Sequence, residues 1–324
     1  MSKTAVVIPN YNGIKYLADC LNSLKKQSEK DFDVIVVDDC STDESIRELE
    51  CNFSWVRSVK RSENGGFAVA VNDGIRIAKE NGAEYILLLN NDTVADEFFV
   101  EKMIHAIKAD SQIFSVQAKM LSLKEPGIID DAGDFYSVLG WAYARGKGKN
   151  ASKYNKKCRI FAACAGAAIY RMDILDEIGL FDEAHFAYLE DIDIGYRARL
   201  CGYYNMYEPE AVVYHAGSAS SGSRYNEFKI RLASRNSVYL VYKNQTLVQK
   251  VFHFLPLTAG FMIKQLFFCL KGYGKIYHNG VLEGLRMCRT PEAKRKALHR
   301  KQSKFSTRCR IEWELWLNIL RKIL

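Results

Sequence analysis

The sequence lacks most of the short motifs that identify common classes of enzyme. It contains no GxGxxG segment and no Walker A segment, which disfavours dinucleotide oxidoreductases and P-loop kinases. No serine or cysteine stands with a histidine in a recognisable context for nucleophilic catalysis. The nine cysteines include no CxxC pair, so neither a disulfide frame nor a zinc site is indicated. No signal peptide precedes the first apolar run, and we therefore expect reduced thiols in the cytosol.

The charge of the chain is distributed unevenly. Residues 250–324 hold 16 Lys and Arg against 4 Asp and Glu, a local balance of +12. The remaining residues carry a balance of −4, which gives the chain its net charge of +8. A protein that binds nucleic acid usually presents a basic binding domain, so a mildly acidic body with a basic tail argues against a nucleic-acid partner.

Apolar, β-branched runs alternate with amphipathic patterns over the first 120 residues. The runs predict strands at 4–9, 32–39, 55–60 and 84–92, with helices over 14–24 and 67–82 between them. This alternation predicts an α/β fold, a mostly parallel sheet with helices on both faces. Ligands of such sheets bind beyond the carboxyl ends of the strands. The turn-rich segment 121–160 predicts a long functional or mobile loop.

Polar residues follow two of the predicted strands. Asp38 and Asp39 end the second strand, where a carboxylate can accept a hydrogen bond from a base or ribose. Asn90, Asn91 and Asp92 follow the fourth strand, and their oxygen atoms suit Mg²⁺ or Mn²⁺ carrying a diphosphate. Ordinary helix caps and turns explain both clusters equally well when each is taken alone.

Three carboxylates stand at the start of a predicted helix over 190–201. Helical spacing places Asp193 and Glu190 on the side of Arg197, which predicts a surface ion-pair group. The neighbours of Asp191 on its own face are small or apolar, and no cation stands among them. A carboxylate without an ion-pair partner in the first turn is a candidate general base.

The chain after residue 245 predicts a separate helical region, so we divide it into domains 1–245 and 246–324. Its apolar run 251–277 is interrupted by Pro256 and Lys264, and dense basic residues follow. This combination predicts peripheral attachment to the anionic inner face of the cell membrane, with a dimer contact as the alternative. The closing segment is amphipathic, and we expect its apolar residues to enter the membrane interface or a partner: Ile311, Trp313, Leu315 and Trp316.

Six segments together resemble family 2 glycosyltransferases in order and spacing. They are "VVIPNYNG", "VIVVDDCSTDES", "ENGGFAVAVNDGI", "YILLLNNDT", "LDEIGLFDEAHFAYLEDIDIGYRARLCGY" and "VVYHAGSAS". The resemblance covers 3–245 and is greatest to bacterial rhamnosyltransferases that build cell-surface polysaccharide. It implies a GT-A fold and an inverting transfer of sugar from a nucleotide diphosphate sugar, by direct displacement.

The resemblance also implies roles for individual residues. The nucleotide would be bound by Pro9, Tyr11, Asp38, Asp39, Asn64, Gly66 and Asn91. A divalent metal, Mg²⁺ or Mn²⁺, would be held by Asp92 and reached by His215. Asp191 would be the base with Glu190 as the alternative, and phosphate would be contacted by Arg224 and Arg235. One departure is "NND" where the family often has two carboxylates, which leaves a single carboxylate for the metal.

The expected partners follow from the same resemblance. The donor would be thymidine diphosphate rhamnose or a UDP-sugar, and the acceptor a saccharide or a lipid-linked saccharide at the cytoplasmic membrane surface. A nucleotidyltransferase that forms nucleotide sugars is a rival, but the segment "PNYNGIKYL" lacks its Gly-rich basic loop. An inactive, membrane-attached scaffold of the same fold is a second rival. The presence of Asp39, Asp92, Asp191 and His215 argues against it.

Overall fold

A central β-sheet organises the computed structural model, which describes residues 2–217, 225–297 and 303–323. The strands of this sheet are β1 Thr4–Asn10, β2 Asp33–Asp38, β3 Arg57–Lys60, β4 Tyr85–Leu89, β5 Thr93–Ala95, β6 Ile113–Ser122, β7 Ile129–Asp131, β10 Cys158–Ile160, β11 Ala167–Arg171 and β12 Tyr204–His215. They lie in the order β10-β12-β6-β11-β4-β1-β2-β3, with β5 on β12 and β7 on β6. A separate pair consists of β8 Asp134–Tyr136 and β9 Ala142–Ala144.

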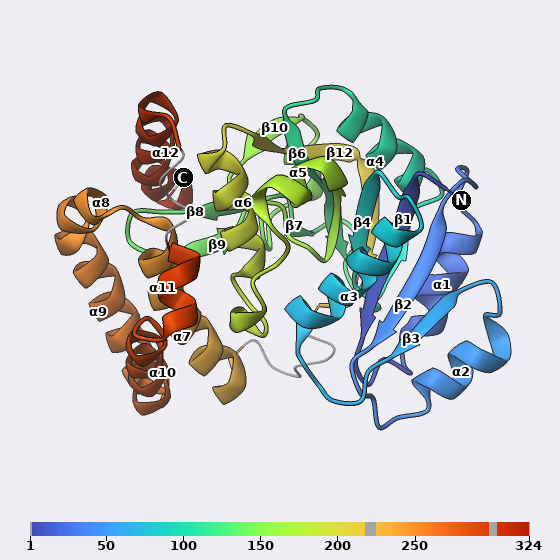
Figure 1. The fold of residues 1–324 in the computed structure, drawn as a ribbon, viewed down its shortest axis with the longest axis horizontal. Helices are drawn as coiled ribbons and strands as arrows, with labels where there is room; N and C mark the ends of the chain where they lie inside the picture. The colour runs from blue at the N-terminus through green and yellow to red at the C-terminus, as the bar shows by residue number, and fades with distance from the viewer. Residues whose placement is uncertain (1, 218–224, 298–302, 324) are drawn as a thin grey trace.

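Helices cover both faces of this sheet (Figure 1). The helices are α1 Leu17–Lys25, α2 Ser45–Asn52, α3 Phe67–Glu80, α4 Phe99–Lys108, α5 Met172–Ile178, α6 Glu190–Leu200, α7 Glu227–Asn244, α8 Leu247–Phe252, α9 Phe254–Leu270, α10 Gly274–Met287, α11 Pro291–Ala297 and α12 Phe305–Ile323. Alternate residues of β1 point to opposite faces, as in any strand. Val6 and Ile8 join a core with α1, α2 and α4, whereas Ala5 and Val7 join a core with α3, α5 and α6. The predicted α/β architecture is therefore confirmed.

The strands β3, β2, β1 and β4 pair in parallel, so their carboxyl ends meet at one edge. Strand β11 lies antiparallel between β4 and β6. Helix α3 approaches β1 so closely that a Cβ atom on Gly74 would lie 2.3 Å from Cγ1 of Val7. A glycine is therefore required where α3 crosses β1.

The prediction of a long loop over 121–160 is wrong. Strand β6 extends to Ser122, and β7, β8, β9 and β10 follow within the same segment. These later strands are three residues long, too short to give a recognisable apolar alternation in the sequence. Residues 134–138 are nonetheless buried, and Phe135, Tyr136 and Val138 form part of a third hydrophobic core.

The C-terminal helices pack on the body of the protein rather than standing apart from it. Helix α10 lies along α7, and α12 lies against α6 and β8. The expectation that Ile311 and Leu315 enter the membrane interface or a partner is wrong, because both have no exposed surface and pack with Tyr136 and Tyr196. Only the opposite face of α12 exposes apolar side chains, including Trp313. Within 2–217, 225–297 and 303–323, no helix is both long and apolar enough to cross a membrane.

Candidate active site

A cavity of about 970 Å³ lies beyond the carboxyl ends of β1, β2 and β4. It brings together nine of the residues predicted from the sequence, which are Pro9, Tyr11, Asp39, Asn64, Gly66, Asn91, Asp92, Glu190 and Asp191. These residues come from the ends of three strands, from the turn before α3 and from the first turn of α6. The strand-end rule therefore located this cavity correctly.

At one end of the cavity, Asp39 fixes the turn that precedes α3. Its carboxylate accepts hydrogen bonds from the backbone N–H of Gly65 at 2.9 Å and of Gly66 at 2.8 Å. It also pairs with Nε of Arg61 at 2.9 Å. Gly66 has a φ of +82°, and a Cβ atom there would lie 2.6 Å from Phe186, so this position requires glycine. Asp39 thereby holds one wall of the cavity in place.

Asp38, also predicted to contact a nucleotide, does not line the cavity. Its side chain instead accepts hydrogen bonds from Nδ2 of Asn10 at 2.9 Å and from the backbone N–H of Ser41 at 3.0 Å. Asn10 in turn accepts a hydrogen bond from the side chain of Asn91 at 2.7 Å. Asp38 thus connects the ends of β1 and β2 behind the cavity wall.

Asp92 and His215 meet near the ends of β4 and β12. Nε2 of His215 lies 3.1 Å from Oδ1 of Asp92, and its Nδ1 lies 2.8 Å from Oδ2 of Asp130. Burial alone would lower the pKa of His215, but the hydrogen bonds that its imidazolium donates to these two carboxylates raise it to about 9. Asp130, which the sequence analysis did not single out, therefore orients the imidazole ring.

The pair formed by Asp92 and His215 fits a divalent cation. The carboxylate of Asp92 and the imidazole of His215 are ligand types that divalent cations such as Mn²⁺ accept, and their polar atoms lie 3.1 Å apart. Asp130 supplies the carboxylate that commonly orients a metal-binding histidine. Because a ligating imidazole must be neutral, binding of the cation would release the proton that His215 holds between the two carboxylates.

The start of α6 is reached through a strained segment. Phe186, Tyr188 and Leu189 all have φ values near +60° to +70°, which is unusual for residues other than glycine. Asn236 on α7 braces this segment by donating hydrogen bonds to three of its carbonyl groups, those of residues 185, 187 and 188. Arg235, a predicted phosphate ligand, instead donates to the carbonyls of residues 184 and 185. Helix α7 thus fixes the entry into α6.

Asp191 is not the isolated carboxylate that helical spacing predicted. It lies in the cavity and is hydrogen-bonded to the carboxyl group of Asp134, from β8. Burial raises the pKa of Asp191 to about 6. Burial and the charges of Asp131 and Asp191 raise the pKa of Asp134 well above its usual range. Asp134 is therefore the member that keeps a proton and donates it to the carboxylate of Asp191.

The carboxylate without a partner is Glu190. It is 7% exposed and lines the cavity, and its Oε2 has no hydrogen-bond partner in the described part of the chain. Burial, followed by the charge of Asp191, raises its pKa well above the ordinary value. The predicted pairing of Asp193 with Arg197 is confirmed, but Glu190 does not belong to it and the group is not at the surface. The reason is that α7 covers this side of α6, which no pattern within α6 reveals.

Asp193 belongs instead to a buried charge network that joins α6 to the C-terminal helices. It pairs with Arg197 at 2.9 Å and with Lys243 of α7 at 2.8 Å, and it has no exposed surface. Lys243 also pairs at 2.6 Å with Asp182, which pairs at 2.6 Å with Lys296 of α11. Burial opposes ionisation, but the neighbouring cations hold the pKa of Asp193 below its usual range. The network therefore holds ionised groups in place.

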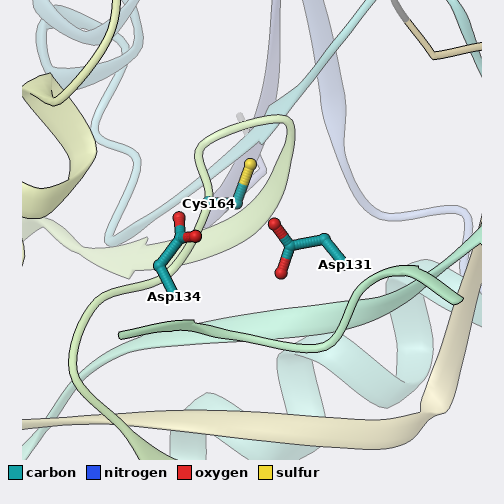
Figure 2. Close-up of side chains that lie close together, drawn as sticks. All are labelled: Asp131, Asp134 and Cys164. Carbon is teal, nitrogen blue, oxygen red and sulfur yellow. The ribbon is translucent and has the colours of Figure 1, made fainter. Parts of the chain in front are cut away.

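Three further cavity residues come from segments that the sequence analysis did not resolve. Figure 2 shows Asp131, Asp134 and Cys164, whose side-chain ends lie within 4.8 Å of one another. Gln117 orients two of them, donating to Oδ1 of Asp131 at 2.8 Å and accepting from the N–H of Cys164 at 2.7 Å. Burial raises the pKa of the Cys164 thiol well above its ordinary value, so the sulfur stays neutral. The acidic run "DDAGD" was the only sequence signal for these residues.

A comparison with known protein families identifies the family to which this chain belongs. The family model described as Glycosyl transferase family 2 matches residues 5–179, more than half of the chain. The chain belongs to glycosyl transferase family 2. The resemblance found in the sequence is thereby confirmed, and the cavity of this family 2 protein holds both the strand-end residues and the carboxylates of α6.

Relatives of this family 2 chain include two named bacterial proteins. It is 34% identical over 107 residues to the glycosyltransferase GlyG of Streptococcus pneumoniae, a match to 32% of this chain and 35% of that protein. The match thus spans about a third of the length of that relative. It is 23% identical over 239 residues to N-acetylglucosaminyl-diphospho-decaprenol L-rhamnosyltransferase of Mycobacterium tuberculosis, covering 67% of this chain and 77% of that protein.

A solved structure confirms the GT-A fold of the family 2 chain. The crystal structure of GalNAc-T7 with UDP, GalNAc and Mn²⁺ matches with a TM-score of 0.60 and 17% sequence identity. The match covers 75% of this chain and 48% of that protein. One residue predicted to contact phosphate, Arg224, lies outside the described residues.

Proposed function

We propose that this protein is an inverting glycosyltransferase that uses a nucleotide diphosphate sugar and a divalent cation. One observation carries the proposal: a single cavity holds Asp39 at one end, Asp92, and the carboxylates of α6, and His215 contacts Asp92 from the neighbouring cavity. A nucleotide, a diphosphate-bound cation and an acceptor hydroxyl each need one of these three groups. Membership of family 2 supports this arrangement of roles.

The chemistry follows from the positions of the carboxylates. Asp191 removes the proton from the acceptor hydroxyl, which attacks the anomeric carbon from the face opposite the leaving nucleotide. Its hydrogen bond from Asp134 keeps the carboxylate ionised and oriented toward the cavity. A cation held by Asp92 and His215 would supply positive charge for the leaving diphosphate. Glu190, buried and without a partner in the described chain, is the alternative base.

For the donor we infer thymidine diphosphate rhamnose, with UDP-hexoses as the next candidates. The support is the mycobacterial L-rhamnosyltransferase, which aligns with two thirds of this chain. For the pathway we infer cell-surface polysaccharide synthesis. The teichuronic acid glycosyltransferase TuaG of Bacillus subtilis, 29% identical over 129 residues, supports that inference.

A thermal-shift and calorimetric screen of nucleotide sugars, with and without Mn²⁺, tests this proposal. UDP- or thymidine diphosphate sugars should stabilise the fold by about 3 kcal/mol at a hundredfold excess over Kd, and only with the cation. Asp92→Ala should remove the requirement for Mn²⁺ together with most of the affinity. Asp191→Asn should bind the donor normally and fail to transfer the sugar. If no nucleotide diphosphate stabilises the wild-type protein in Mn²⁺, the proposal is refuted.

We further propose that α8 and α9 hold the protein at the inner face of the cell membrane. These helices expose large apolar side chains along most of their length, which are Leu247, Val248, Val251, Phe252, Phe254, Leu255, Met262, Ile263, Leu266, Phe267 and Leu270. A soluble monomer rarely exposes so continuous an apolar surface. Exposed Lys271 and Lys275 lie directly after it and complement anionic lipid.

Point variants test this attachment better than truncation, because removal of 250–324 would also remove Ile311 and Leu315 from the core. Phe252→Ser/Leu255→Ser should reduce binding to phosphatidylglycerol vesicles at least tenfold in co-sedimentation. The matched control Trp55→Ser/Phe98→Ser removes two exposed aromatic side chains elsewhere and should bind normally. Retained vesicle binding by the α8–α9 variant would contradict the proposal. A concentration-dependent dimer that this variant abolishes would favour a dimer contact instead.

A further inference from the structure

A second cavity, of about 1160 Å³, lies beside the first one. Tyr143 and Ala144 line both cavities and so form the wall between them. We call it the basic cavity, because seven cationic side chains line it: Arg145, Lys147, Lys149, Lys153, Arg159, Arg321 and Lys322. Among the described residues that line it, Asp130 is the only one with a carboxylate. The cations come from the segment after β9, from the turn before β10, from β10 itself and from the end of α12.

The turn that carries two of these cations is fixed by packing. The guanidinium of Arg145 lies 4.8 Å from the ring centre of Tyr154 and donates a hydrogen bond to the carbonyl of Ala132 at 3.2 Å. Gly146 has a φ of +77°, and a Cβ atom there would lie 2.6 Å from the ring of Tyr154. The position of Arg145 is therefore set by the fold rather than by solvent.

The basic cavity reaches the metal-binding pair directly. Nζ of Lys147 pairs with Asp130 at 2.9 Å, and Asp130 accepts from Nδ1 of His215 at 2.8 Å. Nε2 of the same imidazole contacts Asp92 at 3.1 Å, on the side of the first cavity. A ligand in the basic cavity would therefore lie within a few side chains of the reaction centre.

The clustering of like charge points to an anionic ligand. Isolated basic residues on a surface are solvated, but seven cations around one concavity raise the local potential and attract anions. Arg145 in particular offers the planar donor geometry that matches a phosphate group. The diphosphate of the donor is expected at Asp92, which lines the first cavity and not the basic cavity, whereas His215 lines the basic cavity and contacts Asp92 at 3.1 Å.

We propose that the basic cavity binds a phosphate group of the acceptor, so that the substrate glycosylated here is a saccharide carrying a phosphate ester. This inference rests on the proposed function. The saccharide would pass the wall at Tyr143, with its hydroxyl in the first cavity near Asp191 and its phosphate in the basic cavity. Specificity for the acceptor would then come from the cationic side chains of the basic cavity as well as from contacts to the sugar.

Calorimetry on the full chain, saturated with UDP and Mn²⁺, tests the inference with three probes: glucose 1-phosphate, methyl glucoside and inorganic phosphate. Glucose 1-phosphate should bind at least tenfold more tightly than either other probe, and its affinity should fall as salt is added. Arg145→Gln should weaken its binding tenfold or more. The exposed pair Lys153→Gln/Arg321→Gln gives a second variant that leaves the turn intact, and it should weaken binding in the same direction.

The control variant Lys124→Gln/Lys156→Gln removes two exposed lysines that do not line the basic cavity, and it should bind glucose 1-phosphate like the wild type. Equal loss in this control would show a general charge effect and overturn the proposal. The proposal would also be overturned if methyl glucoside bound as tightly as glucose 1-phosphate. The same holds if inorganic phosphate bound as tightly, because the cavity would then be a general anion site. Binding of UDP with Mn²⁺ is measured separately, so its absence would refute the proposed function instead.

Discussion

Asp191→Asn should stabilise the protein while it abolishes sugar transfer. The wild-type carboxyl group has an ordinary pKa of 3.8 when unfolded and a pKa of about 6 when folded. This difference corresponds to about 3 kcal/mol, the free-energy cost of ionising the buried group at high pH. Between these two pKa values the folded state binds more protons, so the contribution of Asp191 to stability falls as the pH rises through this window. Because asparagine cannot ionise, the variant does not lose this stability as the pH rises.

The expected signature is therefore a difference that depends on pH. At pH 8 the variant should be up to about 3 kcal/mol more stable than the wild type, and at pH 5 the gain should shrink to about half. Urea denaturation at both pH values measures it, with the free energy of unfolding extrapolated to water. Transfer should fall by at least about a hundredfold, the usual contribution of a general base.

Asp134→Asn is the matched control. Its amide still donates a hydrogen bond to Asp191, so we expect this variant to keep transfer at neutral pH, with the rate still rising as Asp191 ionises. A stability difference between Asp191→Asn and wild type that is the same at pH 5 and pH 8 would refute the reasoning. So would full activity of Asp191→Asn, which would move the role of base to Glu190.

Four further variants test other parts of the structure. Asp193→Ala should cost about 3–5 kcal/mol of unfolding free energy, because it leaves Lys243 buried with less compensating charge. Ile311→Ala should cost about 2–5 kcal/mol in the same urea titration, whereas Trp313→Ala, at 71% exposure, should change little. Asp130→Asn should weaken Mn²⁺ binding about 10–100-fold by calorimetry, because it frees the ring of His215. Unchanged Mn²⁺ affinity would contradict the role given to Asp130.

The sequence predicted the strand-end half of the site because that half depends on local rules. Apolar runs that stop at polar residues placed Asp39 and Asp92 at one edge of a parallel sheet, and both line the cavity. The pairing of Asp134 with Asp191 could not be found in this way. The two residues are far apart in the chain, and the short strand that carries Asp134 gives no periodic signal.

Helical spacing failed for a different physical reason. It correctly placed Asp193 beside Arg197, but it could not show that Lys243 arrives from another helix and makes that side of α6 an interior. The same limit applies to α12. Its amphipathic pattern identified Ile311 and Leu315 as one apolar face, but the core that covers this face is formed by residues at least 70 positions earlier, most of them more than a hundred.

The bracing of α6 by α7 and α11 has a consequence for attempts to recombine family members. The family model ends at residue 179, before the carboxylates of α6 begin. Those carboxylates depend on Asn236 for the backbone that leads into the helix, and on Lys243 and Lys296 for the buried charges around it. A chimaera joined at residue 179 would take the strand-end residues of the cavity from one parent. Its catalytic carboxylates, and the helices that support them, would come from the other. Because α12 also packs against α6, the chain from residue 180 through α12 should be exchanged as one unit.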